Sequence, residues 1–399
     1  MTSNPIPQDW RIPYGHQWIS ETEIQEVLDI LRSDWITQGP RVNQFEIDLA
    51  NYTGAIHVTV LSNGTTALEA AMYAIGISPG DEVIVPAMTF VATGNCVFRH
   101  GGTPVIADVD PHTGLLDPDD FARKITPRTR AVIPVQLTGA SCDMEAIKNI
   151  AEQHGIRIIE DACHALGGEY SGEKVCGCGY SDMAVTSFHP VKSITTGEGG
   201  AVFTNEQQLD SRIRAFRNHG ITKDTQYLKE NHGPWYYEMQ GLGTNARLTD
   251  FQCALGQVQL KRLDEFIARR RDIATYYNQQ FESLPGIHTP NNNTDSAWHL
   301  YMVQVDPAIL GVDRLKVFNH LQEAGLGVNV HYIPLHFQPY YQQRLGTMVG
   351  DYPGAESYYW NAISLPIFPL MSDQDADWTV DRVRTVILSF ARSLQPEIP

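Results

Sequence analysis

The sequence has few cysteines, no long apolar run and no excess of positive charge. Its six cysteines in 399 residues are irregularly spaced, which argues against a disulfide framework and favours reduced thiols. Its 29 basic and 46 acidic side chains give a formal net charge of −17, which argues against a polyanion such as nucleic acid as partner. No apolar run approaches membrane-spanning length, and the first ten residues, MTSNPIPQDW, lack the pattern of a signal peptide. We therefore expect a cytoplasmic protein that binds neither nucleic acid nor a membrane.

One pair of cysteines invites a metal interpretation. Cys176 and Cys178 flank a glycine, but no second pair of Cys or His lies nearby in the sequence. A single C-x-C is a weak zinc signal. We expect two thiols in a turn and no metal site.

Apolar runs that alternate with helical patterns predict the fold class. Five β-rich runs are each followed by turn formers or a cap and a helix-like stretch: HVTVLS, EVIVPAM, TPVIADV, AVIPVQL and IRIIEDA. Strands that are apolar on both faces and alternate with helices are typical of an α/β fold with a mainly parallel sheet. Open sheets of this kind bind ligands just past the carboxyl ends of their strands.

The pattern changes beyond about Leu260. Helix signals in LKRLDEFIARRRDIATYYNQQFESL and VFNHLQEAG accompany strand-like WHLYMVQV and LGVNVHY. A final helix carries an apolar stripe at helical spacing, namely Val380, Val383, Ile387, Phe390 and Leu394. Since 399 residues exceed what one core usually organises, we predict a large domain at 1–259 and a smaller C-terminal α+β domain at 260–399.

The stretch LSNGTTALEAAM predicts a strand, a turn and a helix start. The turn holds Ser62, Asn63 and Gly64, and the helix begins near Thr65. Free N–H groups and the positive end of the helix dipole form a cradle for phosphate at such a place. Ser, Thr and Asn are also common helix caps without any ligand, so both interpretations stay open.

The stretch RIIEDACHALGG places carboxylates at the end of an apolar strand. Glu160 and Asp161 close the strand, and His164 follows three residues later. A carboxylate held there keeps a heterocyclic nitrogen protonated, since a nearby negative charge favours the cationic form. The alternatives are a helix cap for Asp161 and a core histidine for His164.

The stretch FHPVKSITTGEGG surrounds a single lysine with unusual company. Lys192 follows an aromatic, a histidine and a proline, and glycines come after it. A lysine that acts as a covalent nucleophile must lose its proton near neutral pH, which needs partial burial or a cationic neighbour. The glycines let the backbone approach a ligand closely, and Ser187 is placed to donate to a phosphate. The alternative is a solvated lysine in a turn.

Two further stretches complete the set. Asn245 and Arg247 lie in GLGTNARLTDFQCALG, and Phe90 in PAMTFVATGN offers a flat surface for a ring. A phosphate cradle, an aspartate for a ring nitrogen, a lysine and an aromatic surface together suit pyridoxal 5′-phosphate (PLP).

These stretches resemble the fold-type I, PLP-dependent nucleotide-sugar aminotransferases of the DegT/DnrJ/EryC1/StrS family. The resemblance covers nearly the whole chain, from IPYGHQWISETEIQEVL and SDWITQGPRVNQFE to SLPIFPLMSDQD. It implies a large domain with a mainly parallel sheet and a small C-terminal domain. It also implies that glutamate donates an amino group and that a keto sugar accepts it.

The resemblance assigns the ring of the cofactor to four residues. Lys192 would be the lysine that carries the cofactor and moves a proton between the substrate carbon and C4′. Asp161 would pair with the pyridine nitrogen, His164 would lie near the phenolic oxygen, and Phe90 would stack on the ring. The 3-dehydratase branch of the family has histidine at the lysine position, whereas here His189 lies three residues earlier. Lysine therefore favours transamination over dehydration.

The resemblance assigns the phosphate to residues of two subunits. Gly64, Thr65 and Ser187 would hold the phosphate of their own subunit. Asn245 matches an asparagine that reaches the phosphate of the neighbouring subunit. This implies a homodimer whose active sites are shared between subunits.

The substrate is expected from a narrower resemblance. FHPVKSITTGEGGAVFTN, GLGTNARLTDFQCALGQVQL and GVNVHYIPLHFQPYY most closely resemble the PseC branch, which aminates C4 of a UDP-linked 4-keto-6-deoxy-N-acetylhexosamine in the pseudaminic acid pathway. By that resemblance, Tyr14, His331, Tyr332 and His336 are candidates for the sugar pocket, with aromatic packing as the alternative. An aminotransferase for another UDP- or dTDP-keto sugar, and a PLP-binding regulator without turnover, are the other functions considered. The absence of a recognisable DNA-binding module in the sequence disfavours the regulator.

Overall fold

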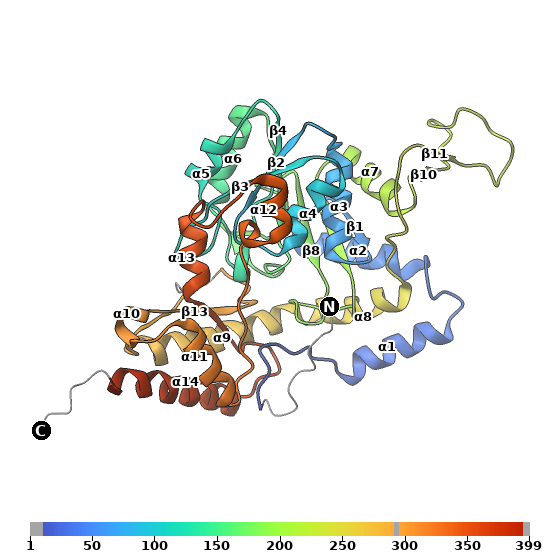
Figure 1. Cartoon of the computed structure of the whole chain (residues 1–399). Helices are drawn as coiled ribbons and strands as arrows, with labels where there is room; N and C mark the ends of the chain where they lie inside the picture. The colour runs from blue at the N-terminus through green and yellow to red at the C-terminus, as the bar shows by residue number, and fades with distance from the viewer. Residues whose placement is uncertain (1–10, 291–294, 394–399) are drawn as a thin grey trace, which may run out of the picture.

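The computed structural model describes residues 11–290 and 295–393 (Figure 1). The segment MTSNPIPQDW and Leu394 of the predicted apolar stripe lie outside the described residues. Among the described helices, none combines the length and the apolar character that crossing a membrane requires.

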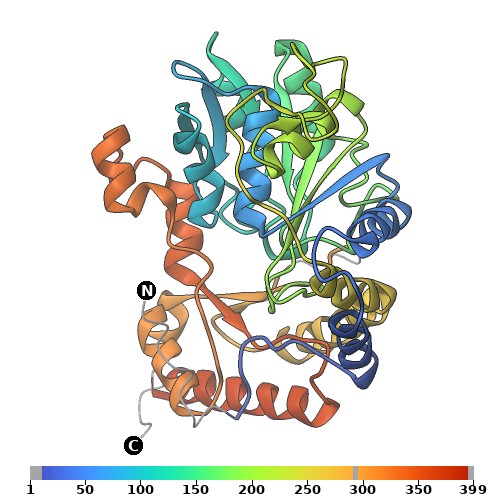
Figure 2. The same ribbon diagram turned by 90° about the vertical axis from the view of Figure 1, so that its right-hand side faces the viewer.

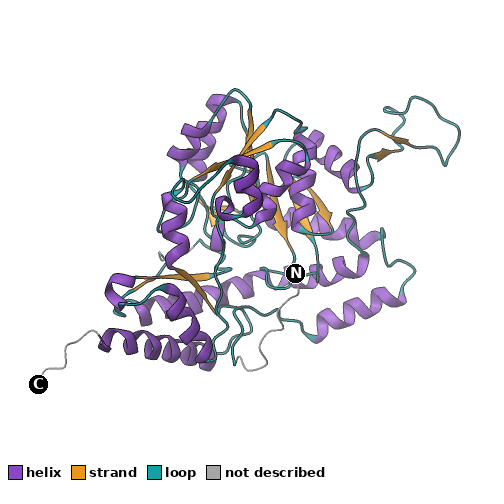
Figure 3. Ribbon diagram, viewed as in Figure 1, coloured by secondary structure: helices purple, strands orange, loops and turns teal. Residues whose placement is uncertain are grey.

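A seven-stranded sheet forms the centre of the molecule (Figure 3). Its strands are β1 (His57–Leu61), β2 (Glu82–Pro86), β3 (Thr103–Ala107), β4 (Thr129–Val132), β5 (Arg157–Asp161), β8 (Met183–Ser187) and β9 (Gly200–Thr204). Their order is β1-β9-β8-β5-β4-β2-β3. Strand β9 runs antiparallel to both neighbours, and the other pairings are parallel. The predicted α/β fold with a mainly parallel sheet is confirmed.

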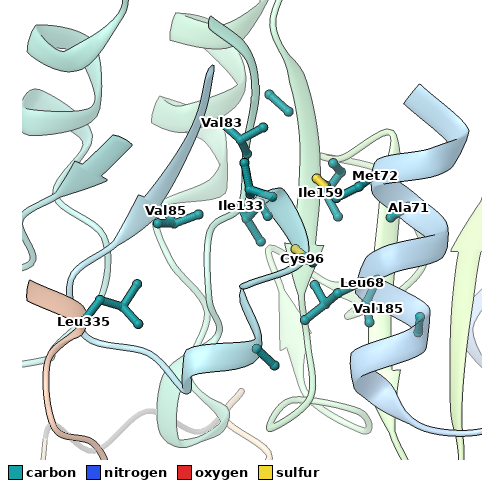
Figure 4. Close-up of a cluster of buried hydrophobic side chains, with 14 of the residues drawn as sticks. Leu68, Ala71, Met72, Val83, Val85, Cys96, Ile133, Ile159, Val185 and Leu335 are labelled. Atoms are coloured by element: carbon teal, nitrogen blue, oxygen red, sulfur yellow. The ribbon is translucent and has the colours of Figure 1, made fainter. Parts of the chain in front are cut away.

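Helices cover both faces of this sheet because its strands are apolar on both sides. One core joins the sheet to α3 (Gly64–Ile75), α4 (Val91–Arg99) and α7 (Gln207–Arg217), and Figure 4 shows part of it. On the other face lie α2 (Pro40–Thr53), α5 (Pro118–Lys124), α6 (Met144–His154) and α8 (Asp250–Lys261). Along β2 the side chains alternate between the two faces. Val83 and Val85 join the first core, and Ile84 joins a core with α6.

A second, smaller sheet organises the C-terminal part. It consists of β12 (Ile287–His288), β13 (Tyr301–Val305) and β14 (Ala362–Leu365), all antiparallel. Three longer helices accompany it, namely α9 (Leu263–Phe281), α11 (Arg314–Glu323) and α14 (Asp373–Ser393). Short helices complete this part, namely α10 (Pro307–Leu310), η2 (Leu335–Phe337), α12 (Pro339–Leu345) and α13 (Pro353–Asn361). The four described residues of the apolar stripe on α14 are buried in this core, as predicted for core packing.

One predicted strand is wrong. The segment LGVNVHY forms only single bridges, Ile12 to Leu326 and Asn329 to Ser364. Its strand-like alternation comes from Leu326 and Val328, which bury their side chains in the C-terminal core. Ile12, far away in sequence, packs into the same core. The predicted division after residue 259 falls within α8 and stays a prediction.

The remaining elements lie at the periphery. Helix α1 (Glu21–Arg32) packs on α8 and projects to one side of the molecule (Figure 1). The hairpin of β10 (Ile221–Thr222) and β11 (Glu238–Met239) projects on the same side. Figure 2 views the molecule from this side. A small hairpin, β6 (Glu169–Tyr170) with β7 (Glu173–Lys174), and the short η1 turn (Leu137–Gly139) complete the fold.

Candidate active site

A cavity of about 340 Å³ gathers most of the predicted site residues. It lies beyond the carboxyl ends of β5 and β8 and beside the amino ends of α3 and α4. Ten of the predicted residues line it: Tyr14, Gly64, Thr65, Phe90, Asp161, His164, Ser187, Lys192, His331 and Tyr332. These residues come from segments spread over more than 300 positions of the chain, so the fold assembles the cavity.

Lys192 lies half-buried in the loop between β8 and β9. The loop is anchored by buried Phe188, whose carbonyl accepts from the Thr196 N–H (3.0 Å), and by a turn from the Lys192 N–H to the His189 carbonyl (2.9 Å). Burial lowers the pKa of the Lys192 amine, and the nearby Cys163 and Asp161 side chains oppose this shift. A larger share of this amine is therefore uncharged near neutral pH than in a solvated lysine.

Asp161 is the carboxylate that strand alternation turns toward the cavity. It is buried at the end of β5, where its Oδ2 accepts from the Thr93 hydroxyl (2.8 Å) and its Oδ1 from the Cys163 N–H (3.2 Å). The preceding Glu160 does not line the cavity and accepts from Gln136 Nε2 (2.7 Å). Burial raises the pKa of Glu160 to about 7. Of the two predicted carboxylates, only Asp161 is placed to meet a ligand.

His164 forms a buried aromatic group beside the amine. Its Nε2 lies 3.0 Å from the Tyr332 hydroxyl, and its ring centroid lies 4.4 Å from that of His299. Burial, followed by the charge of Lys192, lowers the pKa of His164 well below its ordinary value. Within the described part of the chain, His164 Nδ1 is buried without a hydrogen-bond partner. The ring is therefore neutral and has one nitrogen available to a ligand.

The amino end of α3 serves as both a cap and a cradle. Asn63 caps the helix, since its side-chain oxygen accepts from the Thr66 N–H (2.8 Å). This cap leaves the N–H groups of the first helical residues, Gly64 and Thr65, without intrahelical partners. A Cβ added at Gly64 would lie 3.0 Å from Ser187 Cβ and 3.4 Å from Cys163 Sγ. Glycine thus lets the start of α3 lie close against Ser187, so that its N–H groups and the Ser187 hydroxyl line the same cavity, where a phosphate could accept from them.

Aromatic side chains line the rest of the cavity. Phe90 leaves 52% of its surface exposed, and its ring centroid lies 5.7 Å from that of Tyr332. The rings of Tyr14 and His331 lie 5.6 Å apart, and His331 Nδ1 is 2.8 Å from the Ser364 hydroxyl. Burial, followed by the charge of Lys192, lowers the pKa of His331 to about 3.

Two predicted residues lie elsewhere. His336 does not line the cavity; it is fully buried with Nε2 3.0 Å from Glu356 Oε1, which matches the packing alternative. Asn245 is exposed and lines an adjoining cavity that also contains Asn63, Thr65 and Glu198. Its neighbour Arg247 donates to Asn218 Oδ1 (2.7 Å).

The structure adds residues that the sequence does not single out. The Thr93 hydroxyl donates to Asp161, and the hydroxyl oxygens of Thr89 and Thr93 lie 2.8 Å apart. Both threonines belong to the same PAMTFVATGN stretch as Phe90. Their position around the start of α4, next to the predicted site residue Phe90, is a pattern from which sequence analysis could have predicted them. His299 has no such signal, because it comes from a distant segment before β13. Glu198 lies between Gly197 and Gly199 in the loop after Lys192 and lines both cavities.

Cys176 and Cys178 lie in a turn away from the cavity. Both residues have left-handed backbone conformations (φ 72° and 59°). Among residues 11–290 and 295–393, no group of three or more His, Cys, Asp or Glu side chains is arranged to hold a metal ion.

The cavity residues fit PLP. They supply an amine with a lowered pKa, a buried carboxylate, an imidazole nitrogen without a partner among the described residues, and a helix start that lines the cavity beside the Ser187 hydroxyl. These four features match the needs of a pyridine ring that carries an aldehyde, a phenolic oxygen and a phosphate.

Comparisons with known proteins agree with this chemistry. The DegT/DnrJ/EryC1/StrS aminotransferase family matches residues 17–384. The spore coat polysaccharide biosynthesis protein SpsC of Bacillus subtilis is 41% identical over 379 residues, which cover 94% of this chain and 97% of SpsC.

Similar solved structures include several from this group. Helicobacter pylori PseC, an aminotransferase of pseudaminic acid biosynthesis, has a TM-score of 0.87 and 30% identity, covering 95% of this chain and 100% of its own. Spr1654 from Streptococcus pneumoniae in its PLP form has a TM-score of 0.87 and 33% identity, covering 95% and 99%. The chain belongs to the DegT/DnrJ/EryC1/StrS aminotransferase family and is a PLP-dependent sugar aminotransferase.

Proposed function

We propose that this enzyme transfers the amino group of glutamate to C4 of a UDP-linked 4-keto-6-deoxy-N-acetylhexosamine, as in the pseudaminic acid pathway. The proposal is supported by the resemblance of three segments to the PseC branch and by the fold similarity to PseC. The observation that carries the amino-transfer chemistry is the half-buried Lys192 amine facing the same cavity as the buried Asp161 carboxylate.

Lys192 and Asp161 take complementary proton roles in this proposal. PLP, when bound, supplies a carbonyl that condenses with amines and a ring that withdraws electrons from the adjacent carbon. The Asp161 carboxylate holds a proton at the ring nitrogen, because a nearby negative charge favours the cationic ring. With the cofactor bound, the Lys192 amine would be placed to move a proton between the substrate carbon and C4′. His164 donates or accepts a hydrogen bond at the phenolic oxygen.

The remaining cavity residues bind and orient. The Gly64 and Thr65 N–H groups and the Ser187 hydroxyl, which line the cavity, would hold the phosphate, and Phe90 would cover one face of the ring. Tyr14, His331 and Tyr332 lie on the side of the cavity formed with the C-terminal part, where we place the sugar. His336, which lies outside the cavity, has no part in this proposal.

We also propose that the enzyme is a homodimer whose subunits share active sites through Asn245. Exposed apolar side chains support this proposal, since they gather on α1 and on the β10–β11 hairpin, which project on the same side (Figures 1 and 2). They include Ile24, Leu28 and Leu31 on α1, Trp35 in the loop after it, and Trp235 and Tyr237 on the hairpin. Apolar patches of this kind mark contacts between proteins.

The substrate proposal is tested by product analysis. The purified enzyme with PLP and glutamate is supplied with UDP-4-keto-6-deoxy-L-AltNAc, and the sugar nucleotide is analysed by mass spectrometry. A UDP-linked amino sugar, absent from a reaction with Lys192→Ala, is expected. Consumption of glutamate's amino group without an amino sugar would contradict this substrate and favour another UDP- or dTDP-keto sugar. SpsC, a spore coat polysaccharide biosynthesis protein, is 41% identical to this chain, compared with 30% for PseC, so keto sugars destined for a polysaccharide without pseudaminic acid are the next to test.

A further inference from the structure

We propose that Thr93 is a positioning residue for Asp161 and that it works at the end of a directed chain of hydroxyls that begins at Thr89. The Thr93 Oγ1 lies 2.8 Å from Asp161 Oδ2 and 2.8 Å from Thr89 Oγ1. All three side chains are buried, with 1% of Thr89, 1% of Thr93 and 5% of Asp161 exposed. The inference rests on the proposed role of Asp161 toward the ring nitrogen of PLP.

Counting donors fixes the direction of this chain. An ionised carboxylate only accepts, so the single hydroxyl proton of Thr93 is donated to Asp161. The oxygen of Thr93 is then left as an acceptor for Thr89. Thr89 must therefore donate its own proton to Thr93. Hydrogen bonds aligned in this order polarise and strengthen one another in a buried site.

The chain of hydroxyls acts on the orientation of one carboxylate. Asp161 Oδ2 is held by Thr93 and Oδ1 by the Cys163 N–H, so both oxygens are fixed while the carboxylate edge stays in the cavity. A carboxylate whose two oxygens are both held presents a fixed edge to a protonated ring nitrogen, with which it would form a charge-assisted hydrogen bond.

The first turn of α4 links Thr93 to Phe90, the residue predicted to stack on the ring of the cofactor. Thr93 is the third residue of α4, its N–H donates to the Phe90 carbonyl (3.2 Å), and Phe90 is the residue before the helix. The first turn of α4 thus places the aromatic ring of Phe90 and the donor to Asp161 in one rigid unit.

The alternative is that Thr93 only fills space in the core, and matched substitutions separate the two. Thr93→Val keeps the shape of the side chain and removes the hydroxyl, whereas Thr93→Ser keeps the hydroxyl and removes the methyl group. Thr89→Val removes the far donor alone. Asp161→Asn reports whether Asp161 itself contacts the cofactor.

The test is the affinity of the apo-form of the full-length protein for PLP, measured by absorbance titration, with the spectrum of the bound cofactor and the melting temperature recorded for each variant. We expect Thr93→Val to weaken PLP binding roughly tenfold or more, because a buried charged acceptor loses its donor. Its bound-cofactor spectrum should shift in the direction of Asp161→Asn. Thr93→Ser should stay within about threefold of the wild type, and Thr89→Val should be intermediate.

Each outcome has one meaning. Wild-type affinity and spectrum in Thr93→Val, alongside altered ones in Asp161→Asn, would overturn the inference while leaving the role of Asp161 intact. Loss of affinity in Thr93→Ser as large as in Thr93→Val would assign Thr93 to packing and also overturn it. An unchanged Asp161→Asn would instead contradict the proposed role of Asp161. Should Thr93→Val not fold, the other two variants decide. Near-wild-type PLP affinity in Thr93→Ser with weakened affinity in Thr89→Val would support the inference, and unchanged affinity in Thr89→Val would overturn it.

Discussion

Three buried histidines beside Lys192 give the cavity a neutral, low-dielectric wall. His164, His299 and His331 are each at most 8% exposed, and burial lowers the pKa of all three. Neutral imidazoles do not compete with the cofactor for the Asp161 carboxylate. They also couple the stability of the fold to pH.

The pH dependence has a definite sign. The folded state excludes a proton from His331 until about pH 3, whereas the unfolded chain takes one up below about pH 6.5. The stability that depends on neutral His331 is therefore fully present above pH 6.5 and is lost as the pH falls. We expect lowering the pH from 7.5 to 5 to destabilise His331→Gln by about 2 kcal/mol less than the wild type. Urea unfolding at both pH values measures this difference.

A matched control guards this prediction. His112→Gln removes a histidine from an exposed position and should follow the wild type at both pH values. Equal acid destabilisation of His331→Gln and the wild type would show that His331 is not kept neutral by the fold.

Residue types in the sequence predicted much of the site, whereas the remaining assignments depend on which side chains the fold buries and which it turns toward the cavity. Lys192 was set apart by its neighbours, and the structure brings it into one cavity with Asp161. The choice between Glu160 and Asp161 depends on which face of β5 each occupies. His299 could not be predicted, because its contact with His164 joins two residues that are far apart in the sequence and share no local pattern. Likewise, His336 looks like a site residue in sequence but pairs with Glu356.

At the scale of elements, the start of α3 carries the proposed phosphate site. Gly64 lets the start of this helix lie close to Ser187, since an added Cβ would lie 3.0 Å from Ser187 Cβ and would push the two proposed phosphate donors apart. Gly64→Ala should therefore weaken PLP binding roughly tenfold, comparable to the loss of one hydrogen bond to a charged group. Titration of the apo-protein with PLP measures the change.

Free phosphate provides the control for this element. If the added methyl group distorts the cradle, inorganic phosphate should also compete less well with PLP in Gly64→Ala than in the wild type. Unchanged PLP affinity in a folded Gly64→Ala would place the phosphate elsewhere.

Periodicity predicted the elements whose pattern is local. The five apolar runs before residue 162 correspond to β1–β5, since buried strands of a parallel sheet are continuously apolar. Strands β8 and β9 flank the lysine loop and contain small and polar residues, so they are not among these runs. LGVNVHY has the alternation of a strand, but its apolar side chains pack into the C-terminal core without a partner strand along its length.

At the scale of the whole molecule, shared active sites make a quantitative prediction. Lys192→Ala and Asn245→Ala variants should each lose most activity as separate homodimers. The two variants are mixed in equal amounts and allowed to exchange subunits, so that half of the dimers are heterodimers. If Asn245 serves the neighbouring subunit, each heterodimer has one of its two sites intact, and roughly a quarter of wild-type activity should return. Aminotransferase assays on the mixture, with its dimer content measured by light scattering, check this.

The opposite arrangement gives the opposite result. If Asn245 serves its own subunit, each heterodimer holds one site without Lys192 and one without Asn245, and no activity returns. The change of sequence pattern near Leu260 predicts a division after residue 259, but the sequence alone does not predict the dimer contacts, because these depend on surfaces that meet only in the assembled molecule.

The most direct test of the central claim is the identity of the lysine that holds the cofactor. The PLP-loaded enzyme is reduced with borohydride, digested and analysed by mass spectrometry. We expect the mass of the reduced cofactor on Lys192 and no reduced cofactor on any residue of Lys192→Ala. Attachment of the cofactor to another lysine, or to no lysine in a protein that binds PLP, would contradict this expectation.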